Sequence, residues 1–388
     1  MQDKYHMLKE NDTWELVPRP RGAHVITGKW IFKNKFHADS MLESEAHLLL
    51  YIDNIVLAAS SPELLHRIID QFCLEFTMKD LGPVHFFLSI QVRRMAVGFF
   101  LSRAQYADEK RAEMMNCTPA STSFDVKAKV SSTTGTPVHD PMLYRSSIGA
   151  LQYLTLTRSD LTYAVQQACL HMHDPMDVHW ILVKWILRYV RGTVTKGLQL
   201  RRSTLPMVVT YSDANWAGCP DTRRSMSGFC IFFGDSLVSW SSKRQAIMSR
   251  SSVEAEFRGV ANAAAECCWL CHLLGELHIK IDKATLLYCD NVSVVYLMKN
   301  PVHHGCTKHI ELDVHFIREK VAIGEIRTLH VPTRQQIPDI MTKGLPKAVF
   351  EDFRSSLCIA DDARTARRWG SKWLTESCWI ADRIGAIC

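Results

Sequence analysis

Four acidic residues in the C-terminal half of the chain stand where a carboxylate is hard to explain by structure alone. Asp213 and Asp290 each follow a short apolar run that is typical of a buried strand. Glu256 lies beside the apolar positions of a long amphipathic segment, and Asp339 falls in the first turn of an expected helix. Strand ends and helix starts are where mixed α/β sheets gather their chemistry, so these four residues are candidates for one shared site.

Clustered carboxylates repel one another unless a cation joins them. Mg²⁺ and Mn²⁺ prefer carboxylate and water oxygens as ligands. Two such ions about 3.5–4 Å apart activate a water on one side of a phosphodiester and stabilise the leaving oxygen on the other. The four acids therefore predict a two-metal site that cleaves phosphodiesters. Each acid taken singly has a structural alternative, because an Asp at a helix start is commonly a cap and an Asp after a strand a turn residue.

The segment that would position these acids has the pattern of one compact mixed-sheet domain. Apolar residues at intervals of three and four over 252–277 predict a long amphipathic helix. Three strands precede this helix, and strands alternate with helices after it. The predicted strands are 207–211, 228–233, 237–240, 286–289 and 326–331, and the further helices are 291–299, 307–322 and one from residue 335.

The rest of the chain divides into stretches that differ in composition and in the pattern of apolar residues. Residues 117–141 are rich in Pro, Ser, Thr and Gly and predict a linker, whereas 142–205 predict a helical connection. Residues 359–388 fit none of these patterns and are expected to form a separate tail. Within residues 1–116 we expect strands at 29–33 and 48–58, a helix at 62–76, and a hairpin from the apolar runs 84–92 and 97–101.

Composition limits the classes of protein to consider. A chain of 388 residues suggests two or three domains, and a net charge of +6 permits a polyanionic partner without requiring one. No apolar run approaches the ~20 residues of a membrane helix, and the first twelve residues are too charged for a signal peptide. Thirteen scattered cysteines favour reduced thiols. We therefore expect a cytoplasmic or nuclear protein that does not contact a membrane.

Seven motifs resemble the ribonuclease H domain of copia-type LTR retrotransposons, in the order and spacing of that family over residues 206–358. The resemblance implies a ribonuclease H-like α/β (α+β) fold, with a mixed five-stranded sheet and flanking helices. It also implies metal-dependent hydrolysis of the RNA strand of RNA–DNA hybrids. The motifs are YSDANWAG at 211–218, SWSSKRQ at 239–245, SSVEAEF at 251–257, CDN at 289–291, NPVHH at 300–304, TKHIE at 307–311 and DIMTK at 339–343.

Carried over position by position, the resemblance makes four acids catalytic and the ligands of two Mg²⁺ or Mn²⁺ ions: Asp213, Glu256, Asp290 and Asp339. It implies no small-molecule cofactor. Glu254 competes for the helix position, although Glu256 better matches the Glu–aromatic pair of the family. Five basic residues are expected to contact the phosphates of the hybrid, with a solvated surface as the alternative for each. They are Lys243, Arg244, Lys308, His309 and Lys343.

Residues 1–116 resemble the reverse transcriptase of the same polyprotein, but only as a truncated palm remnant. The matching pieces include GKWIFK at 28–33, LYIDNIV at 50–56 and FTMKDLG at 76–82. Compared with the family, a large block is missing between Ser40 and Met41, including the strand with the other catalytic Asp. Asn54 also replaces one carboxylate of the expected Asp pair, and an amide binds Mg²⁺ far more weakly. Asp53 is then the only polymerase ligand left, so we expect no DNA synthesis.

Two functions of different classes follow from this sequence. The first is a retrotransposon Pol fragment with ribonuclease H activity. The alternative is an inactive retroelement relic that at most binds nucleic acid through its basic surface. Cleavage of an RNA–DNA hybrid distinguishes them.

Overall fold

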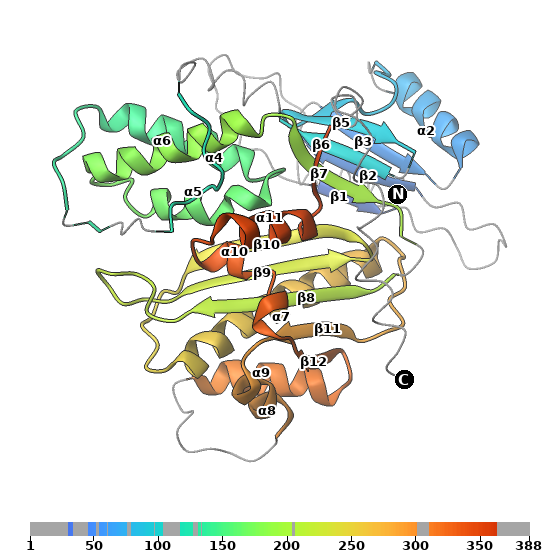
Figure 1. Cartoon of the computed structure of the whole chain (residues 1–388). Coiled ribbons are helices and arrows are strands. Elements are labelled where there is room, and N and C mark those ends of the chain that lie inside the picture. Colours follow the sequence, from blue (N-terminus) through green and yellow to red (C-terminus); the bar gives the residue numbers. More distant parts are fainter. Residues whose placement is uncertain are drawn as a thin grey trace, which may run out of the picture. The chain divides into compact units, whose positions relative to one another are not determined.

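A computed structural model describes the chain in eleven segments (Figure 1). The chain divides into two compact units, residues 1–84 and residues 85–388. Asp53, Lys308 and His309 lie outside the described residues, as does the expected tail beyond residue 362. The described segments are 30–33, 46–51, 54–59, 61–75, 79–96, 98–103, 117–126, 131–132, 134–203, 206–300 and 310–362.

The first unit contains a three-stranded antiparallel sheet followed by a helix. β1 (Trp30–Lys33) pairs with β2 (Ala46–Tyr51), and β2 pairs with β3 (Asn54–Ala59). Helix α2 (Pro62–Glu75) follows and packs on β3. The run over 48–58, predicted as one strand, is therefore a hairpin in which Tyr51 pairs with Asn54.

A five-stranded antiparallel sheet in the second unit combines strands from stretches that the sequence separated. Its order is β13-β7-β6-β5-β4. The predicted hairpin is present, but Arg93 and Arg94 lie inside β5 because the turn falls where Met95 pairs with Gly98. Two expectations need correction, because β7 lies within the predicted helical connection and β13 at the start of the predicted tail. The strands are β4 (Phe86–Phe87), β5 (Ile90–Met95), β6 (Gly98–Ser102), β7 (Lys196–Arg201) and β13 (Ile359–Asp361).

Helices occupy most of the predicted connection. They are α4 (Pro141–Leu154), the 3₁₀ turn η2 (Ser159–Leu161), α5 (Thr162–Cys169) and α6 (Asp177–Gly192). The described part of the expected linker, residues 117–126, packs against them: Phe124 is buried, and the indole N–H of Trp185 donates to the Thr122 carbonyl at 2.9 Å. This stretch is therefore part of the core, because its few apolar side chains have a helix surface to cover.

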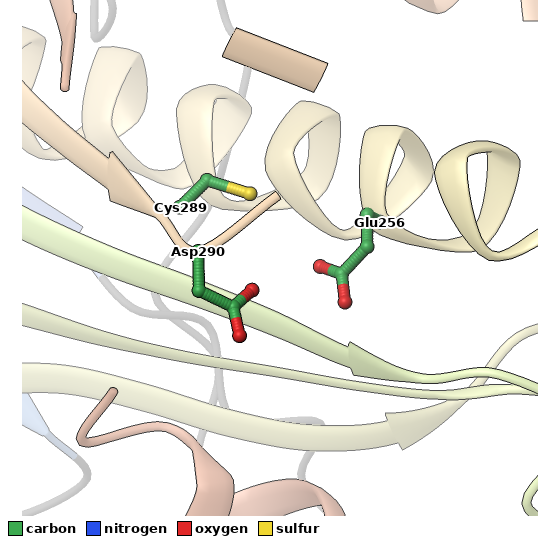
Figure 2. A group of neighbouring side chains, drawn as sticks. All are labelled: Glu256, Cys289 and Asp290. Atoms are coloured by element: carbon green, nitrogen blue, oxygen red, sulfur yellow. The ribbon is translucent and has the colours of Figure 1, made fainter. Parts of the chain in front are cut away.

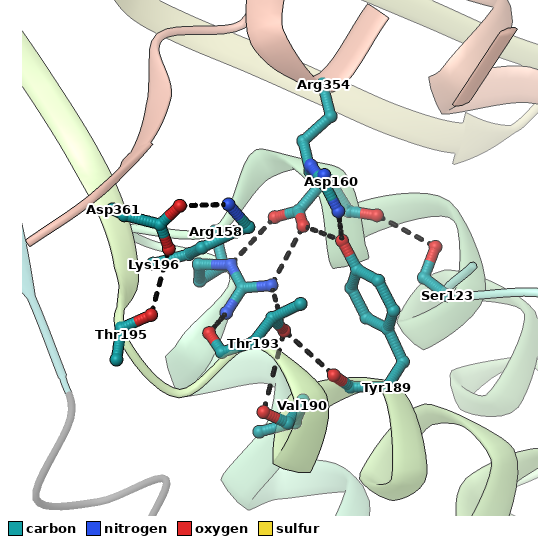
Figure 3. Close-up of polar contacts among 10 residues, drawn as sticks. All are labelled: Ser123, Arg158, Asp160, Tyr189, Val190, Thr193, Thr195, Lys196, Arg354 and Asp361. Atoms are coloured by element: carbon teal, nitrogen blue, oxygen red, sulfur yellow. Dashed lines mark hydrogen bonds and ion pairs between the residues drawn. The ribbon is translucent and has the colours of Figure 1, made fainter. Parts of the chain in front are cut away.

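A buried polar network joins η2, α6 and the later helix α11 (Lys347–Ser356) (Figure 3). Arg158 forms a two-pronged pair with Asp160, both N–O distances being 2.9 Å, and donates to both oxygens of Thr193 at 2.8 Å. The Tyr189 hydroxyl donates to Asp160 at 2.5 Å, and Arg354 donates to that hydroxyl at 3.1 Å. We call these five residues the Arg158 network. They tie the C-terminal helix to the connection through charged groups.

The second sheet of this unit has the predicted mixed architecture. Its order is β10-β9-β8-β11-β12, with β8, β9 and β10 antiparallel and β11 and β12 parallel to β8. Three meandering strands followed by two parallel crossovers are the expected ribonuclease H-like arrangement, so this prediction is confirmed. The strands are β8 (Val208–Asn215), β9 (Met226–Phe233), β10 (Ser236–Arg244), β11 (Thr285–Cys289) and β12 (Ile326–His330).

Helices cover both faces of this sheet. Long helix α7 (Ser252–Glu276) packs on one face through Cys267, Leu270 and Leu274, which meet Val208 of β8. Its first half shares a second core with α8 (Val292–Lys299) and α9 (Glu311–Ala322). The other face shares the core of the connecting helices, together with η4 (Thr333–Gln335), α10 (Asp339–Thr342) and α11 nearby. Among the described helices, none is long and apolar enough to span a membrane.

Candidate metal centre

The fold brings the four predicted acids together, each from a different element; we call them the carboxylate cluster. Asp213 lies on β8, Glu256 in the second turn of α7, Asp290 directly after β11, and Asp339 at the first residue of α10. Asp213 was expected near a strand end, but β8 continues to Asn215 because its pairing with β9 extends that far. Parallel pairing of β8 with β11 explains how Asp213 and Asp290, which are far apart in the sequence, converge.

Glu256 and Asp290 lie near each other, with Cys289 beside them (Figure 2). A carboxylate oxygen of each, together with the Cys289 sulfur, forms a group whose atoms all lie within 4.8 Å of one another. Burial raises the pKa of the Cys289 thiol, and the charge of Glu256 raises it further. A neutral thiol is a poor ligand for a hard cation. The two carboxylates are therefore the useful ligands of this group.

Two glycines permit the close packing that positions the cluster. Gly228 of β9 pairs with Asp213, and a Cβ at Gly228 would stand 2.6 Å from the Cβ of Met341 in α10. A Cβ at Gly259 of α7 would stand 3.3 Å from the Ser212 hydroxyl of β8. Real Cβ contacts are rarely so short, so α10 reaches Asp213 and α7 reaches β8 because these positions lack a side chain. Neither glycine belongs to the seven sequence motifs.

Burial and mutual repulsion oppose ionisation of three of the four acids. Burial, and then the charges of Asp213 and Asp290, raise the pKa of Glu256 to about 9. Burial and the charge of Asp213 raise the pKa of Asp339 to about 7. Burial also raises the pKa of Asp213, against the opposing effect of Lys343. Perturbed pKa values of this kind gather at functional sites.

The oxygens of the cluster fit a hard divalent cation. Glu256 is only 7% exposed, and its Oε2 atom has no hydrogen-bond partner among the described residues. A buried carboxylate oxygen without a partner costs free energy that a bound cation recovers. Glu254 has no such vacancy, since it pairs with Arg258 at 2.7 Å and accepts the Arg250 backbone N–H at 2.8 Å. Of the two residues, Glu256 is therefore the one with a carboxylate oxygen left for a ligand, and its role stays a prediction.

Besides Asp339, two further residues at the end of α10 contact the carboxylates. The Thr342 hydroxyl donates to Asp213 Oδ2, and the Lys343 ammonium lies 2.8 Å from Asp339 Oδ1. Lys343 was predicted to contact phosphates, but here it faces the carboxylates, which raise its pKa against the effect of burial. Thr342 stands within the DIMTK motif, so the sequence contained the signal without indicating its partner.

The parallel strand β12 and the η4 turn after it add one contact each to Asp290. A ring nitrogen of His330 lies 3.1 Å from the Asp290 carbonyl oxygen, and the Thr333 hydroxyl lies 3.5 Å from Asp290 Oδ2. Both contacts involve residues for which sequence patterns offered no definite role. They help to orient the carboxylate that leaves β11.

Two of the predicted phosphate-binding residues lie on β10 and are not part of the cluster. Lys243 is exposed, whereas Arg244 is partly buried, with a guanidinium nitrogen 3.8 Å from the Cys219 sulfur. Their contact with a hybrid stays a prediction.

A cavity of about 600 Å³ lies beside the first half of α7 and the start of α9. Arg258 and Asn262 line it, and none of the four acids does. At about 100° per residue, Arg258 points some 200° around the helix from Glu256. The cavity is therefore on the other side of α7 from the carboxylate cluster.

Comparison with known proteins identifies one matching family model and several similar sequences. Residues 42–125 match the family model described as reverse transcriptase (RNA-dependent DNA polymerase). The chain is 40% identical over 319 residues to the retrovirus-related Pol polyprotein from transposon RE1 of Arabidopsis thaliana, covering 82% of this chain and 22% of that protein. It is 47% identical to an uncharacterized mitochondrial protein of the same plant, covering 58% of this chain and 93% of that protein.

A solved structure of LC11-RNase H1 in complex with RNA/DNA hybrid is also similar. The TM-score is 0.27 at 16% identity, covering 33% of this chain and 88% of that chain.

The strand order and the acids at the sheet edge define a ribonuclease H-like domain within a larger, mixed α/β chain. With the sequence matches, they show that the chain belongs to the copia-type retrotransposon Pol polyproteins, including a reverse transcriptase segment. It spans about a fifth of the length of these polyproteins.

Proposed function

We propose that residues 206–358 hydrolyse the RNA strand of RNA–DNA hybrids with Mg²⁺ or Mn²⁺. The observation that carries the proposal is the carboxylate cluster itself: four acids from four elements, three with raised pKa values and one with an unpartnered buried oxygen. Family membership supports a nucleic acid as the substrate. Oxygen-only ligation suits these hard ions.

The chain contributes binding, orientation and proton control. Asp213 on β8 and Asp290 directly after β11 would supply carboxylate oxygens to the ions, and Glu256 and Asp339 would supply the remaining protein ligands. When bound, two divalent ions activate the attacking water and stabilise the leaving oxygen. The hydrogen bond from Thr342 holds the Asp213 carboxylate in one orientation. Glu256, whose pKa is about 9 in the metal-free chain, would hold a proton at neutral pH and would release it to solvent when a cation binds its carboxylate.

We infer that the reverse transcriptase segment does not synthesise DNA. It lacks a catalytic strand of the family pattern, and Asn54 stands where that pattern has a carboxylate. Two-metal nucleotidyl transfer requires more than one carboxylate ligand. Primer extension by the full chain on an RNA template would contradict this inference.

A direct test incubates the full chain with an end-labelled RNA–DNA hybrid and Mg²⁺. The wild type is expected to cleave the RNA strand, and Asp290→Asn to reduce the rate at least ~100-fold, since disturbing even the groups that orient metal ligands costs 10–100-fold. Asp282→Asn, an exposed acid in the loop before β11, serves as the matched control and should cleave normally. Equal cleavage by wild type and Asp290→Asn, or none by either, supports the alternative of an inactive relic.

A further inference from the structure

Trp216 is a large aromatic side chain that is held in place yet left half exposed, directly after the strand that carries Asp213. It follows β8 three residues after Asp213, and 48% of its surface is accessible. Its indole N–H donates to the Ser249 carbonyl at 3.0 Å. Because this bond uses the polar edge of the ring, the surface that remains exposed is hydrocarbon.

The anchor of Trp216 continues to the start of α7. The Ser249 hydroxyl donates to the Gln245 side chain at 2.9 Å, and Gln245 donates in turn to the Ala255 carbonyl at 2.8 Å. Ser249 and Gln245 are both buried. The ring is therefore fixed relative to Glu256, the residue after Ala255. A fixed aromatic side chain loses little conformational entropy when a ligand stacks on it.

Three arginines lie close to Trp216 or to its anchor Ser249 along the chain. Arg223 and Arg224 belong to the same β8–β9 loop, residues 216–225, and Arg250 follows the residue that anchors the indole. Within the described part of the chain, none of these three guanidinium groups forms an ion pair. The single acid of the loop, Asp221, is held by the Ser131 hydroxyl at 2.5 Å and the Ser132 backbone N–H at 2.7 Å.

We propose that Trp216, Arg223, Arg224 and Arg250 form a surface that binds the hybrid strand next to the point of cleavage. Exposed aromatic rings bind nucleic acid by stacking on bases or sugars, and neighbouring cations bind the phosphates. An apolar protein partner would also cover the ring, but it leaves three guanidinium groups without a counter-charge. The inference deepens the proposed function and depends on the same substrate.

Hybrid binding, rather than cleavage, tests the surface. Fluorescence anisotropy of a labelled RNA–DNA hybrid is measured with the full chain carrying Asp290→Asn, so that the probe is not consumed. Adding Trp216→Ala should weaken binding about 10-fold or more, because one stacked base contributes that much. Trp216→Phe, which keeps a ring but loses the bond to Ser249, should retain most of the affinity. Trp269→Ala is the matched control, since Trp269 on α7 is 56% exposed and outside the basic loop.

Salt dependence separates charge from shape. The double variant Arg223→Ala/Arg224→Ala should lower the slope of log affinity against log salt concentration by about one to two, one unit for each phosphate that is no longer neutralised. Trp216→Ala should leave that slope unchanged. A loop that merely supports the fold would not divide its effects in this way.

The outcomes distinguish this inference from the proposed function. Wild-type cleavage with unchanged hybrid binding by Trp216→Ala overturns the surface and leaves the nuclease. If binding depends on Trp216 but the wild type does not cleave, the surface is supported and the nuclease function is overturned. Absence of any hybrid binding overturns the surface as well.

Discussion

The carboxylate cluster and the Arg158 network are both buried collections of charged groups in the second unit, but they differ in how the charge is balanced. Asp160 accepts two hydrogen bonds from Arg158 and one from Tyr189. Burial opposes its ionisation, yet Arg158 outweighs that effect and lowers the pKa of Asp160. In the cluster, the pKa values of Asp213, Glu256 and Asp339 are raised instead.

This difference separates a buried group of charges that is balanced from one that is not. The Arg158 network is complete in itself and joins η2, α6 and α11. Among the described residues, the cluster has four carboxylates paired with a single cation, Lys343, so carboxyl groups outnumber their counter-charge. Replacing a carboxylate by an amide should therefore lower the free energy of unfolding in the Arg158 network and raise it in the carboxylate cluster.

The largest expected effect is at Asp160. Asp160→Asn removes the charge that compensates Arg158, which is 4% exposed, and should lower the free energy of unfolding by about 3–5 kcal/mol. Urea unfolding followed by tryptophan fluorescence measures it, since Trp185 lies on α6. The control is Asp361→Asn, whose pair with Lys196 is half exposed and should contribute about 1 kcal/mol or less. Similar losses for both variants would remove the distinction between a buried and an exposed pair.

The opposite sign is expected at Glu256. In the metal-free chain at pH 8, Glu256→Gln should raise the free energy of unfolding by on the order of 1–3 kcal/mol, because it removes a carboxylate that the fold disfavours. Glu254→Gln, two residues away, should instead destabilise the chain by breaking its pair with Arg258. Destabilisation of equal size by both variants would mean that Glu256 is an ordinary structural acid.

The same variant predicts a pH dependence. The pKa of Glu256 is about 9 in the folded chain and ~4.3 when unfolded, so the folded state holds the extra proton between these values. The stability that this proton contributes is complete below pH ~4 and is lost as pH rises toward 9. Glu256→Gln should flatten the slope of unfolding free energy against pH, and Mg²⁺ should do likewise in the wild type because it stabilises the ionised ligands. Urea unfolding at a series of pH values measures that slope.

The smallest effect is expected at Lys343, the cation beside the carboxylate cluster. Lys343→Met removes the only ammonium described beside the cluster and should cost about 1 kcal/mol in EDTA, given that its side chain is 37% exposed. Saturating Mg²⁺ should abolish the loss, since the ions then supply the positive charge. Thermal unfolding with and without Mg²⁺ measures both values. Lys347→Met, on the exposed side of α11, is the control, and a loss that persists in Mg²⁺ would contradict the counter-charge role.

Local patterns predicted the elements of the ribonuclease H-like sheet well. The spacing of apolar residues over 252–277 matches α7 almost to the residue, since helical periodicity depends on which face is buried. Strand ends were less certain: β8 continues beyond its apolar run to Asn215 because β9 supplies hydrogen bonds there. The residues at the end of β8 carry no sign of the strand that will pair with them.

Sequence patterns did not predict contacts between distant segments, for a related reason. Nothing in residues 359–361 indicates a strand, because β13 exists only as a partner for the edge of β7. Phe124 likewise lies in a stretch rich in turn-forming residues, and only the helices it packs against make it part of a core. Neither Trp216 nor Gly228 belongs to a periodic pattern.

The sequence by itself determined the family and the order of strands and helices in the ribonuclease H-like sheet, and it singled out four acids as candidates. The tertiary structure paired Glu254 with Arg258, turned Lys343 toward Asp339, and joined η2 to α11 through Arg158. These last features depend on which side chains meet between segments that are distant along the chain. Periodicity reports whether a residue is buried, whereas only the packed structure specifies the charges buried with it.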